Sequence, residues 1–222
     1  VCVYADTCWA SREWAARVTR GEDLARSYGF GVVHLQTEGV VQLARRKKGF
    51  PRQGMQFCTQ ELKMKPILAF LDRVDPDRDA IVAVGIRRAE SKARSQWPEE
   101  VPNSPNHGGR DAWFPLVRVT DAERDALLAR AGFESLPYRS KECSPCINSN
   151  RADLRLLTEA RIAEIEAIEA TMGHTSEGKP RTLFRPYRHG GAVGIREVVR
   201  WAWSERGQYD PDDGCDSGYC GD

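Results

Sequence analysis

Three short apolar runs along the chain predict buried β-strands. The runs cover residues 1–4, 31–35 and 80–84. Each run is continuous rather than alternating with polar residues, which is typical of strands covered on both faces of a parallel sheet. The first run leads to Asp6 and Thr7, so we expect polar side chains at its carboxyl end. His34, inside the second run, is expected to be a packed or hydrogen-bonded core histidine.

Segments with apolar residues at helical spacing separate and follow these strands. The predicted helices cover residues 11–28, 66–71, 121–131, 153–172 and 195–203. The third begins at a capping box formed by Thr120 and Glu123, and the fourth is predicted to be the longest. Strands that alternate with helices predict an α/β fold in which a parallel sheet is covered on both faces.

The end of the chain differs in composition from the rest. Residues 207–222 contain five Asp, four Gly and two Cys, with no Lys or Arg. This segment has too little apolar surface to fold alone. We therefore predict an α/β domain over residues 1–206 and a flexible acidic tail over residues 207–222.

The composition of the whole chain argues against two classes of protein. The 222 residues include 33 Lys and Arg against 32 Asp and Glu, which argues against a protein held on nucleic acid mainly by bulk charge. No apolar run approaches the roughly 18 residues of a membrane-spanning helix. We expect a cytoplasmic protein with no membrane partner. Val1 stands where a Met would open a complete protein, so we expect the chain to begin inside a longer coding sequence.

Seven cysteines are unevenly spread over the chain. Cys143 and Cys146 form a CxxC motif, and Cys215 and Cys220 form a close pair in the tail. Because the count is odd, a closed disulfide framework would leave one cysteine over, and we interpret these residues as thiols with metal or redox roles. A CxxC motif fits zinc, an iron–sulfur cluster or a dithiol redox pair. The alternative, which we weigh mainly for Cys2, is a thiol that packs as a small apolar side chain.

Polar residues at strand ends are the candidate binding positions, because ligands of open α/β sheets bind beyond the carboxyl ends of the strands. The third predicted strand is followed by Gly85, Arg87, Arg88 and Glu90. Guanidinium groups bind phosphate or sulfate through two parallel hydrogen bonds, so Arg87, Arg88 and the nearby Arg94 form a candidate anion site. The alternative is that the arginines are surface residues paired to Glu90 and Glu99.

Four segments carry a family resemblance. They are Tyr-Ala-Asp-Thr at 4–7, Phe-Cys-Thr-Gln-Glu-Leu-Lys-Met-Lys-Pro at 57–66, Val-Gly-Ile-Arg-Arg-Ala-Glu-Ser at 84–91, and Leu-Pro-Tyr…Cys-Ser-Pro-Cys-Ile at 136–147. The segment Trp-Phe-Pro-Leu-Val-Arg-Val-Thr at 113–120 matches the family segment that precedes the capped helix. Over most of residues 1–170 the chain resembles the phosphoadenosine phosphosulfate reductase family. More narrowly, it resembles the phage and bacterial branch that includes sulfur-transfer enzymes of DNA phosphorothioation.

The resemblance implies a fold, an activity and a set of site residues. The fold is adenine-nucleotide alpha-hydrolase-like, with a Rossmann-like parallel sheet, and the enzyme moves sulfur or sulfite on an adenine nucleotide. The residues implied at the nucleotide and its phosphate or sulfate are Asp6, Thr7, Lys63, Gly85, Arg87, Arg88 and Glu90. The implied ligands of a 4Fe–4S cluster are Cys58, Cys143 and Cys146, with Cys215 or Cys220 as the fourth.

The chain departs from the family pattern at two places. It lacks the Ser-Gly-Gly-x-Asp-Ser phosphate loop that precedes the first matched strand in family members, so we expect either a fragment or a degraded nucleotide site. It has Phe57 and Cys58 where cluster-bearing reductases have two adjacent cysteines. One ligand must therefore come from elsewhere, or the cluster has an open iron that could bind sulfur for transfer.

The tail and the partners complete the expectations from the resemblance. Cys220, or Cys215, is the candidate for the tail thiol that attacks the sulfur of the bound substrate, against the alternative of an inert tail. A thioredoxin-like protein is the expected reductant, nucleic acid is expected only as a sulfur acceptor, and a homodimer is allowed. Two alternatives to the enzyme stay open: a zinc-stabilised binding module and an inactive, degenerate nucleotide-binding domain.

Overall fold

Two of the predicted apolar runs pair as parallel strands in the computed structural model, which describes residues 1–136, 142–186 and 189–204. β1 (Cys2–Asp6) pairs with β2 (Val32–Gln36). The third run contributes only β3 (Val82–Ala83), which lies parallel to β5 (Arg110–Trp113). β4 (Glu100–Ser104) pairs antiparallel with the other edge of β5, so the second sheet has the order β3-β5-β4.

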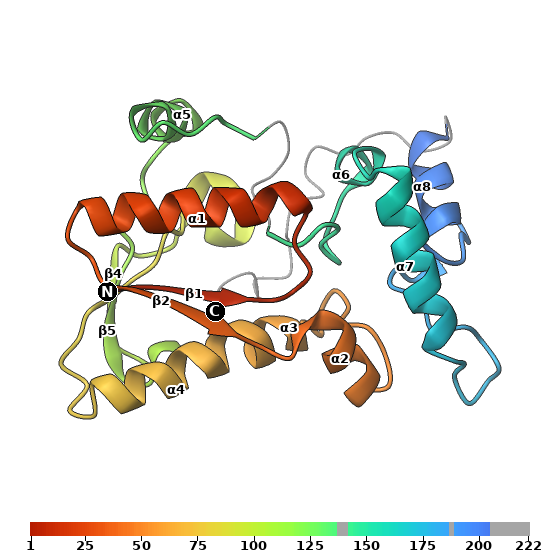
Figure 1. The fold of residues 1–222 in the computed structure, drawn as a ribbon, viewed down its shortest axis with the longest axis horizontal. Helices are drawn as coiled ribbons and strands as arrows, with labels where there is room; N and C mark the ends of the chain where they lie inside the picture. Colours follow the sequence, from red (N-terminus) through yellow and green to blue (C-terminus); the bar gives the residue numbers. More distant parts are fainter. Residues whose placement is uncertain (137–141, 187–188, 205–222) are drawn as a thin grey trace.

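Helices lie on both sides of the β1–β2 sheet (Figure 1). The helices of this part of the chain are α1 (Arg12–Ser27), α2 (Gly39–Arg46), α3 (Phe57–Thr59), the π-helical turn η1 (Gln60–Met64) and α4 (Lys65–Val74). α1 covers one side of the sheet, and α3 and α4 cover the other. The mixed α/β class is therefore confirmed, but the described strands form two separate sheets, one with the antiparallel strand β4, and not the single parallel sheet that we predicted. No helix in the described ranges is both long and apolar enough to cross a membrane.

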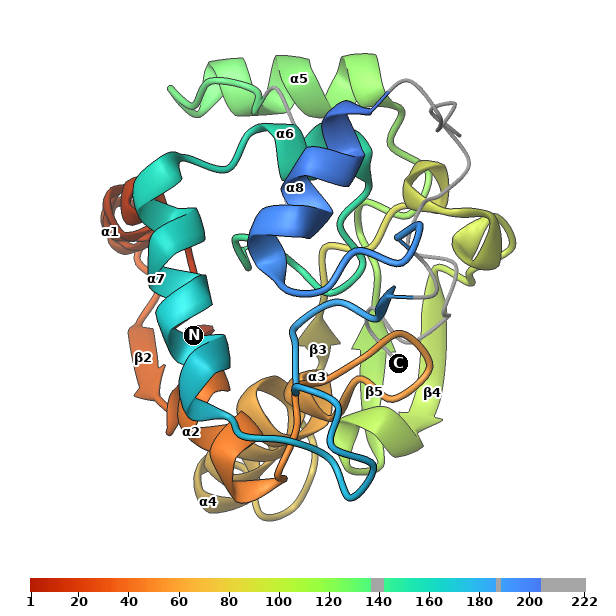
Figure 2. The ribbon, with the colours of Figure 1, turned by 90° about the vertical axis from the view of Figure 1, so that its right-hand side faces the viewer.

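Three helices near the end of the described chain lie together, beside the strands (Figure 2). They are α6 (Arg151–Arg155), α7 (Glu159–Thr171) and α8 (Ile195–Trp203). Their fully buried side chains Leu154, Ile165 and Val198 belong to the same apolar core as Leu43 and Leu62. This core connects the helical part of the chain to the elements around the carboxyl end of β1.

Several predicted elements differ from the observed ones. The helix predicted over residues 153–172 is two helices, because the Thr158 side chain accepts a hydrogen bond from the backbone N–H of Arg161 and caps a new helix. Residues 100–104 form the strand β4, which was not predicted. The segment contains Pro and Asn, which are uncommon in strands, so its sequence does not have a strand pattern. α5 (Asp121–Arg130) begins at the predicted capping box.

Two residues predicted to be buried lie at the surface. His34 is exposed, although it is hydrogen-bonded as expected, with its Nδ1 3.1 Å from Oε1 of Glu22. Its ring packs edge-on against Tyr4. Cys2 is also exposed, at the start of β1. Both lie in strands whose apolar pattern suggested full burial, but the two-stranded sheet leaves part of its surface open to solvent.

The side chain of Glu169, on α7, holds two other segments of the chain by hydrogen bonds. Its two carboxylate oxygens accept hydrogen bonds from the backbone N–H groups of Leu183, at 2.8 Å, and Ile195, at 2.9 Å. The second bond satisfies a free N–H at the start of α8. Gly194 has φ +82°, and an added Cβ there would approach the Glu169 carboxylate to 3.2 Å, so glycine suits this contact.

Replacing Glu169 with Gln is expected to flatten the pH dependence of stability. Burial raises the pKa of Glu169 above its ordinary value of 4.5. The folded chain therefore keeps this proton to higher pH than the unfolded chain, and its contribution to the free energy of unfolding falls as pH rises from about 4.5 through the raised pKa. Urea unfolding of both proteins over this range measures the effect. The exposed Glu13→Gln is the control, and an unchanged slope in Glu169→Gln would contradict the assignment.

Candidate functional site

The CxxC motif lies beside the carboxyl end of β1, far from it in sequence. Cys143 forms an isolated antiparallel bridge with Ala10, and the backbone N–H of Ser144 donates to the carbonyl of Trp9 at 3.0 Å. The Thr7 hydroxyl lies 3.9 Å from the Cys143 sulfur. The segment that follows the first strand therefore forms one wall around the first thiol of the motif.

Arg161 of α7 and Trp9 hold the CxxC loop in place. Arg161 donates from Nε to the carbonyl of Ser144 at 2.7 Å and from Nη2 to the carbonyl of Trp9 at 3.3 Å. Its guanidinium also lies over the Trp9 ring, 4.2 Å from the ring centre. The indole N–H of Trp9 donates to the carbonyl of Pro145 at 2.9 Å. These buried and partly buried contacts join the loop, β1 and α7 into one unit.

Cys58 and Lys63 reach the same place from α3 and η1. Cys58 interacts electrostatically with Cys146, and Cys143 interacts with both Cys58 and Cys146. Lys63 interacts with Cys143 and Cys146 in the same way. The structure therefore brings together the three predicted cluster ligands, Cys58, Cys143 and Cys146, which we call the three thiols. The π-helical turn that carries Lys63 is a type of irregularity found often at functional sites.

Glu142, directly before the CxxC motif, is the central polar group. Its Oε1 accepts hydrogen bonds from the hydroxyls of Tyr4, at 2.8 Å, and Thr7, at 2.9 Å. Its Oε2 lies 3.0 Å from Nζ of Lys63. Burial opposes the charged form, but Lys63 and the two hydroxyls outweigh it and hold the pKa of Glu142 below its ordinary value. Sequence reasoning missed this residue, whose only local signal is its place beside Cys143.

The environment of Cys58 and Cys143 disfavours free thiolates. Burial raises the pKa of Cys143 to about 12, although Lys63 acts in the opposite direction. Burial also raises the pKa of Cys58, with a further contribution from Cys146. A reactive dithiol pair normally has a lowered thiol pKa, so the redox interpretation of the CxxC motif loses support. A metal-bound thiol is deprotonated outright by the metal charge, so coordination would overcome the raised pKa.

The three thiols form no ready-made metal site in the described part of the chain, so their role as ligands stays a prediction. Among the described residues, no group of three or more His, Cys, Asp or Glu side chains is placed to hold a metal ion. A single zinc draws its sulfur ligands to about 2.3 Å from one centre. An iron–sulfur cluster instead binds each thiolate at a different iron, so it needs convergent thiols that stay further apart. Cys215 and Cys220, the candidates for the fourth ligand, lie outside the described residues.

The predicted nucleotide residues fall into two groups. Thr7 and Lys63 lie at the three thiols through the contacts above, and Asp6 is adjacent in sequence, with its Oδ1 accepting from the Cys8 N–H at 2.7 Å. The remaining four follow β3, in the second sheet; they are Gly85, Arg87, Arg88 and Glu90. No recorded polar contact between described residues joins this second group to the thiol site.

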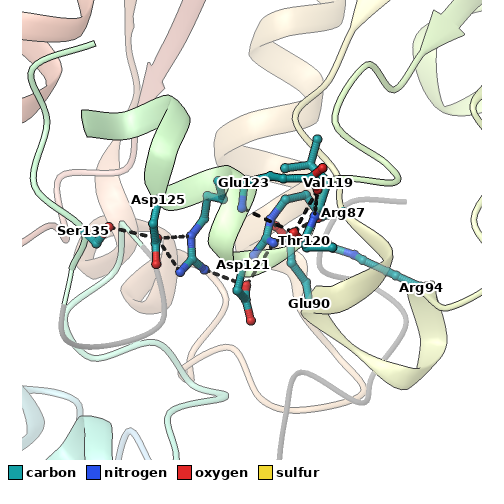
Figure 3. A network of polar contacts seen from close by, with 10 residues as sticks. Arg87, Glu90, Arg94, Val119, Thr120, Asp121, Glu123, Asp125 and Ser135 are labelled. Carbon is teal, nitrogen blue, oxygen red and sulfur yellow. Dashed lines mark hydrogen bonds and ion pairs between the residues drawn. The ribbon is translucent and has the colours of Figure 1, made fainter. Parts of the chain in front are cut away.

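Arg87 is buried in a polar network at the start of α5 (Figure 3). Its Nη1 lies 3.0 Å from the Asp121 carboxylate and 3.3 Å from the carbonyl of Val119, and its Nε lies 3.7 Å from Glu90. Arg94 also pairs with Glu90. The pairing to Glu90 that we weighed as the alternative is therefore present, whereas Glu99 pairs with Arg118 instead.

Arg88 is likewise engaged within the chain. Its Nε donates to the carbonyl of Trp97 at 2.8 Å. Gly85 lies beside Leu116, with space for an added Cβ at ordinary contact distance. These contacts give the segment after β3 a structural role, and its contact with a nucleotide stays a prediction.

Replacing Arg87 with Ala is expected to destabilise the fold, which differs from the expectation of a purely binding role. The substitution removes the Arg87 donor to the carbonyl of Val119 and leaves the Asp121 carboxylate with Arg124 alone, a loss on the order of 1–3 kcal/mol. Thermal unfolding measures it. Arg118→Ala is the matched control, because Arg118 is 73% exposed and surface ion pairs contribute little. Equal melting temperatures for the two variants would show that the Arg87 network does not stabilise the chain.

Comparison with known proteins gives similarity without a functional name. No protein-family model matches this chain. The chain is 26% identical over 240 aligned residues to an uncharacterized 37.8 kDa protein in the gpa 5′ region of Escherichia phage 186. The alignment covers 92% of this chain and 66% of the phage protein, so the chain spans about two thirds of the length of that relative.

Proposed function

We propose that this chain is an enzyme of the phosphoadenosine phosphosulfate reductase type that releases sulfite from an adenine sulfonucleotide. The observation that carries the proposal is the convergence of Cys58, Cys143, Cys146 and Lys63 at the carboxyl end of β1. The thiols would hold a 4Fe–4S cluster, with Cys215 or Cys220 as the fourth ligand. When bound, the cluster would supply an iron–sulfur centre, and the Lys63 ammonium would raise its potential and attract the anionic substrate.

The arrangement of the fold supports this proposal. The β1–β2 and β3–β5 pairs are parallel, and α1 and α4 cover opposite sides of the first pair, which are two features that a Rossmann-like sheet shares. Ligands of such sheets bind beyond the carboxyl ends of the strands, where the three thiols lie. Lys63 supplies a cation for an anionic group, and its neighbours Asp6 and Thr7 would contact the nucleotide. Gly85, Arg87, Arg88 and Glu90 would complete the nucleotide site from the second sheet.

Two thiols supply the two electrons that the proposed reduction requires. A thiolate of the tail, Cys220 or Cys215, forms a bond to the sulfur of the substrate, and the bond between that sulfur and the phosphate oxygen breaks. The electron pair of that bond leaves with the nucleotide. A thiol of a thioredoxin-like donor then attacks the tail sulfur, which releases sulfite and leaves a disulfide between donor and enzyme. The two thiols lose two electrons, and the sulfate sulfur gains them.

Reductive sulfite release is the first of the two sulfur reactions to test, because it needs no adenylated acceptor. Sulfur transfer to an adenylated acceptor is the alternative reaction. The test is an anaerobic assay of the full chain with adenosine 5′-phosphosulfate or its 3′-phosphorylated form, thioredoxin and thioredoxin reductase. We expect sulfite and the nucleotide product in equal amounts. Absence of sulfite with both substrates would refute the reductase proposal.

A further inference from the structure

Glu142 is a carboxylate at a place where a negative charge works against the proposed ligand. It lies beside Cys143 and within 3.0 Å of Lys63, and its side chain is only 8% exposed. A sulfonucleotide is an anion, so a buried carboxylate at this distance weakens its attraction to the site. The presence of Glu142 therefore needs an explanation other than charge.

The contacts of Glu142 supply a geometric explanation. One oxygen collects the hydroxyls of Tyr4 and Thr7, which both come from the end of β1 and its following turn. The other oxygen holds the ammonium of Lys63, which comes from η1. The carboxylate thus joins two elements separated in sequence and fixes the Lys63 side chain, which is otherwise long and 40% exposed.

An ammonium group has three N–H donors. Glu142 engages the Lys63 ammonium from one direction, and the interactions of Lys63 with Cys143 and Cys146 place the thiols near it. A lysine held in this way directs its remaining donors to a fixed position, whereas an untethered lysine loses rotamer entropy when it binds the anion.

We propose that Glu142 is a positioning residue that aims the Lys63 ammonium at the anionic group of the substrate. This inference rests on the proposed function, because it takes the anion to be the phosphosulfate of an adenine sulfonucleotide. Tyr4 and Thr7 serve the same purpose by orienting the Glu142 carboxylate.

A role of Glu142 in positioning Lys63 and a purely electrostatic effect of its charge predict opposite changes in anion binding for Glu142→Gln. The substitution removes a negative charge, so charge alone predicts equal or tighter binding of an anion. Positioning predicts weaker binding, because the amide has only one oxygen for the hydroxyls and the ammonium together. We expect binding of adenosine 5′-phosphosulfate about 10-fold weaker, as for the loss of a charge-assisted hydrogen bond. Binding of uncharged adenosine should be unchanged.

The experiment measures the dissociation constants of adenosine 5′-phosphosulfate and adenosine by calorimetry on the full chain, purified anaerobically. Glu61→Gln is the matched control, because Glu61 is a neighbouring carboxylate on η1 that pairs with Lys47 and Lys65 instead. Tyr4→Phe removes one hydroxyl donor to Glu142 without a change in charge, and it also should weaken only the sulfonucleotide. It replaces Glu142→Gln as the test should that variant fail to fold.

The outcomes separate this inference from the proposed function. If the unaltered chain does not prefer adenosine 5′-phosphosulfate over adenosine, both are overturned. If it has that preference and the Glu142→Gln and Tyr4→Phe variants keep it, the proposed function stands and the positioning role of Glu142 is overturned. Loss of the preference in these variants, with Glu61→Gln unaffected, supports both.

Discussion

If the three thiols hold the proposed iron–sulfur cluster, replacing Cys143 with Ser is expected to remove most of the bound iron. Cys143 is the most enclosed of the three thiols by its contacts, since it is bridged to Ala10 and lies 3.9 Å from the hydroxyl of Thr7. Even the outer partners of metal ligands affect metal affinity 10–100-fold, so loss of a ligand should lower the iron bound per chain at least about tenfold. Iron analysis of the anaerobically purified variant measures this directly.

The matched control for this substitution is Cys2→Ser. Cys2 is exposed and begins β1, at the opposite end of the strand from the three thiols. It should retain the iron content and the melting temperature of the unaltered chain, whereas Cys143→Ser should also melt at lower temperature because a bound group stabilises the folded state. Equal iron in both variants would exclude Cys143 as a ligand.

Replacing Arg161 with Met is the second prediction with a large effect. Arg161 lies outside the thiol site on α7, but its guanidinium satisfies the carbonyls of Ser144 and Trp9 and covers the Trp9 ring. The side chain is 15% exposed. Methionine leaves the carbonyl of Ser144 without the Arg161 donor and leaves the carbonyl of Trp9 with the N–H of Ser144 alone. We expect the free energy of unfolding to fall by about 1.5–3 kcal/mol and bound iron to fall with it.

The substitution Arg161→Lys separates the effect of the guanidinium geometry from the effect of the positive charge. Arg161→Lys keeps the positive charge but lacks the planar fork that reaches two carbonyls at once, so it should recover only part of the stability. Urea unfolding and iron analysis of the same samples give both readouts. A midpoint for Arg161→Met equal to that of the unaltered chain would show that α7 does not support the CxxC loop.

Local sequence patterns were enough to predict those helices whose ends are determined by neighbouring residues in the sequence. The helix at residues 195–203 was predicted at the bounds that α8 has, and the capping box of Thr120 and Glu123 located the start of α5. The division of residues 153–172 into α6 and α7 escaped prediction, because apolar residues continue through the break at Leu156 and Leu157. A single hydroxyl cap at Thr158 decides the break, and the hydrophobic pattern carries no trace of it.

The sequence indicated the cysteines of the candidate site but not the residues that support them, and the role of these cysteines as cluster ligands stays a prediction. Cysteine spacing and the resemblance identified the three thiols, and the structure brings them together. Glu142 and Arg161 could not be recognised, because their partners Thr7 and Trp9 lie 135 and 152 residues away in sequence. Such pairings depend on the tertiary fold, as does the burial of Arg87 against Asp121.

The most direct test of the central claim is the metal content of the full chain after anaerobic purification. The proposal that Cys58, Cys143 and Cys146 hold an iron–sulfur cluster predicts a brown protein that absorbs near the blue–violet edge. It predicts about four iron and four acid-labile sulfide per chain, as for a 4Fe–4S cluster. A colourless protein that carries one zinc, or neither iron nor sulfide, would contradict it.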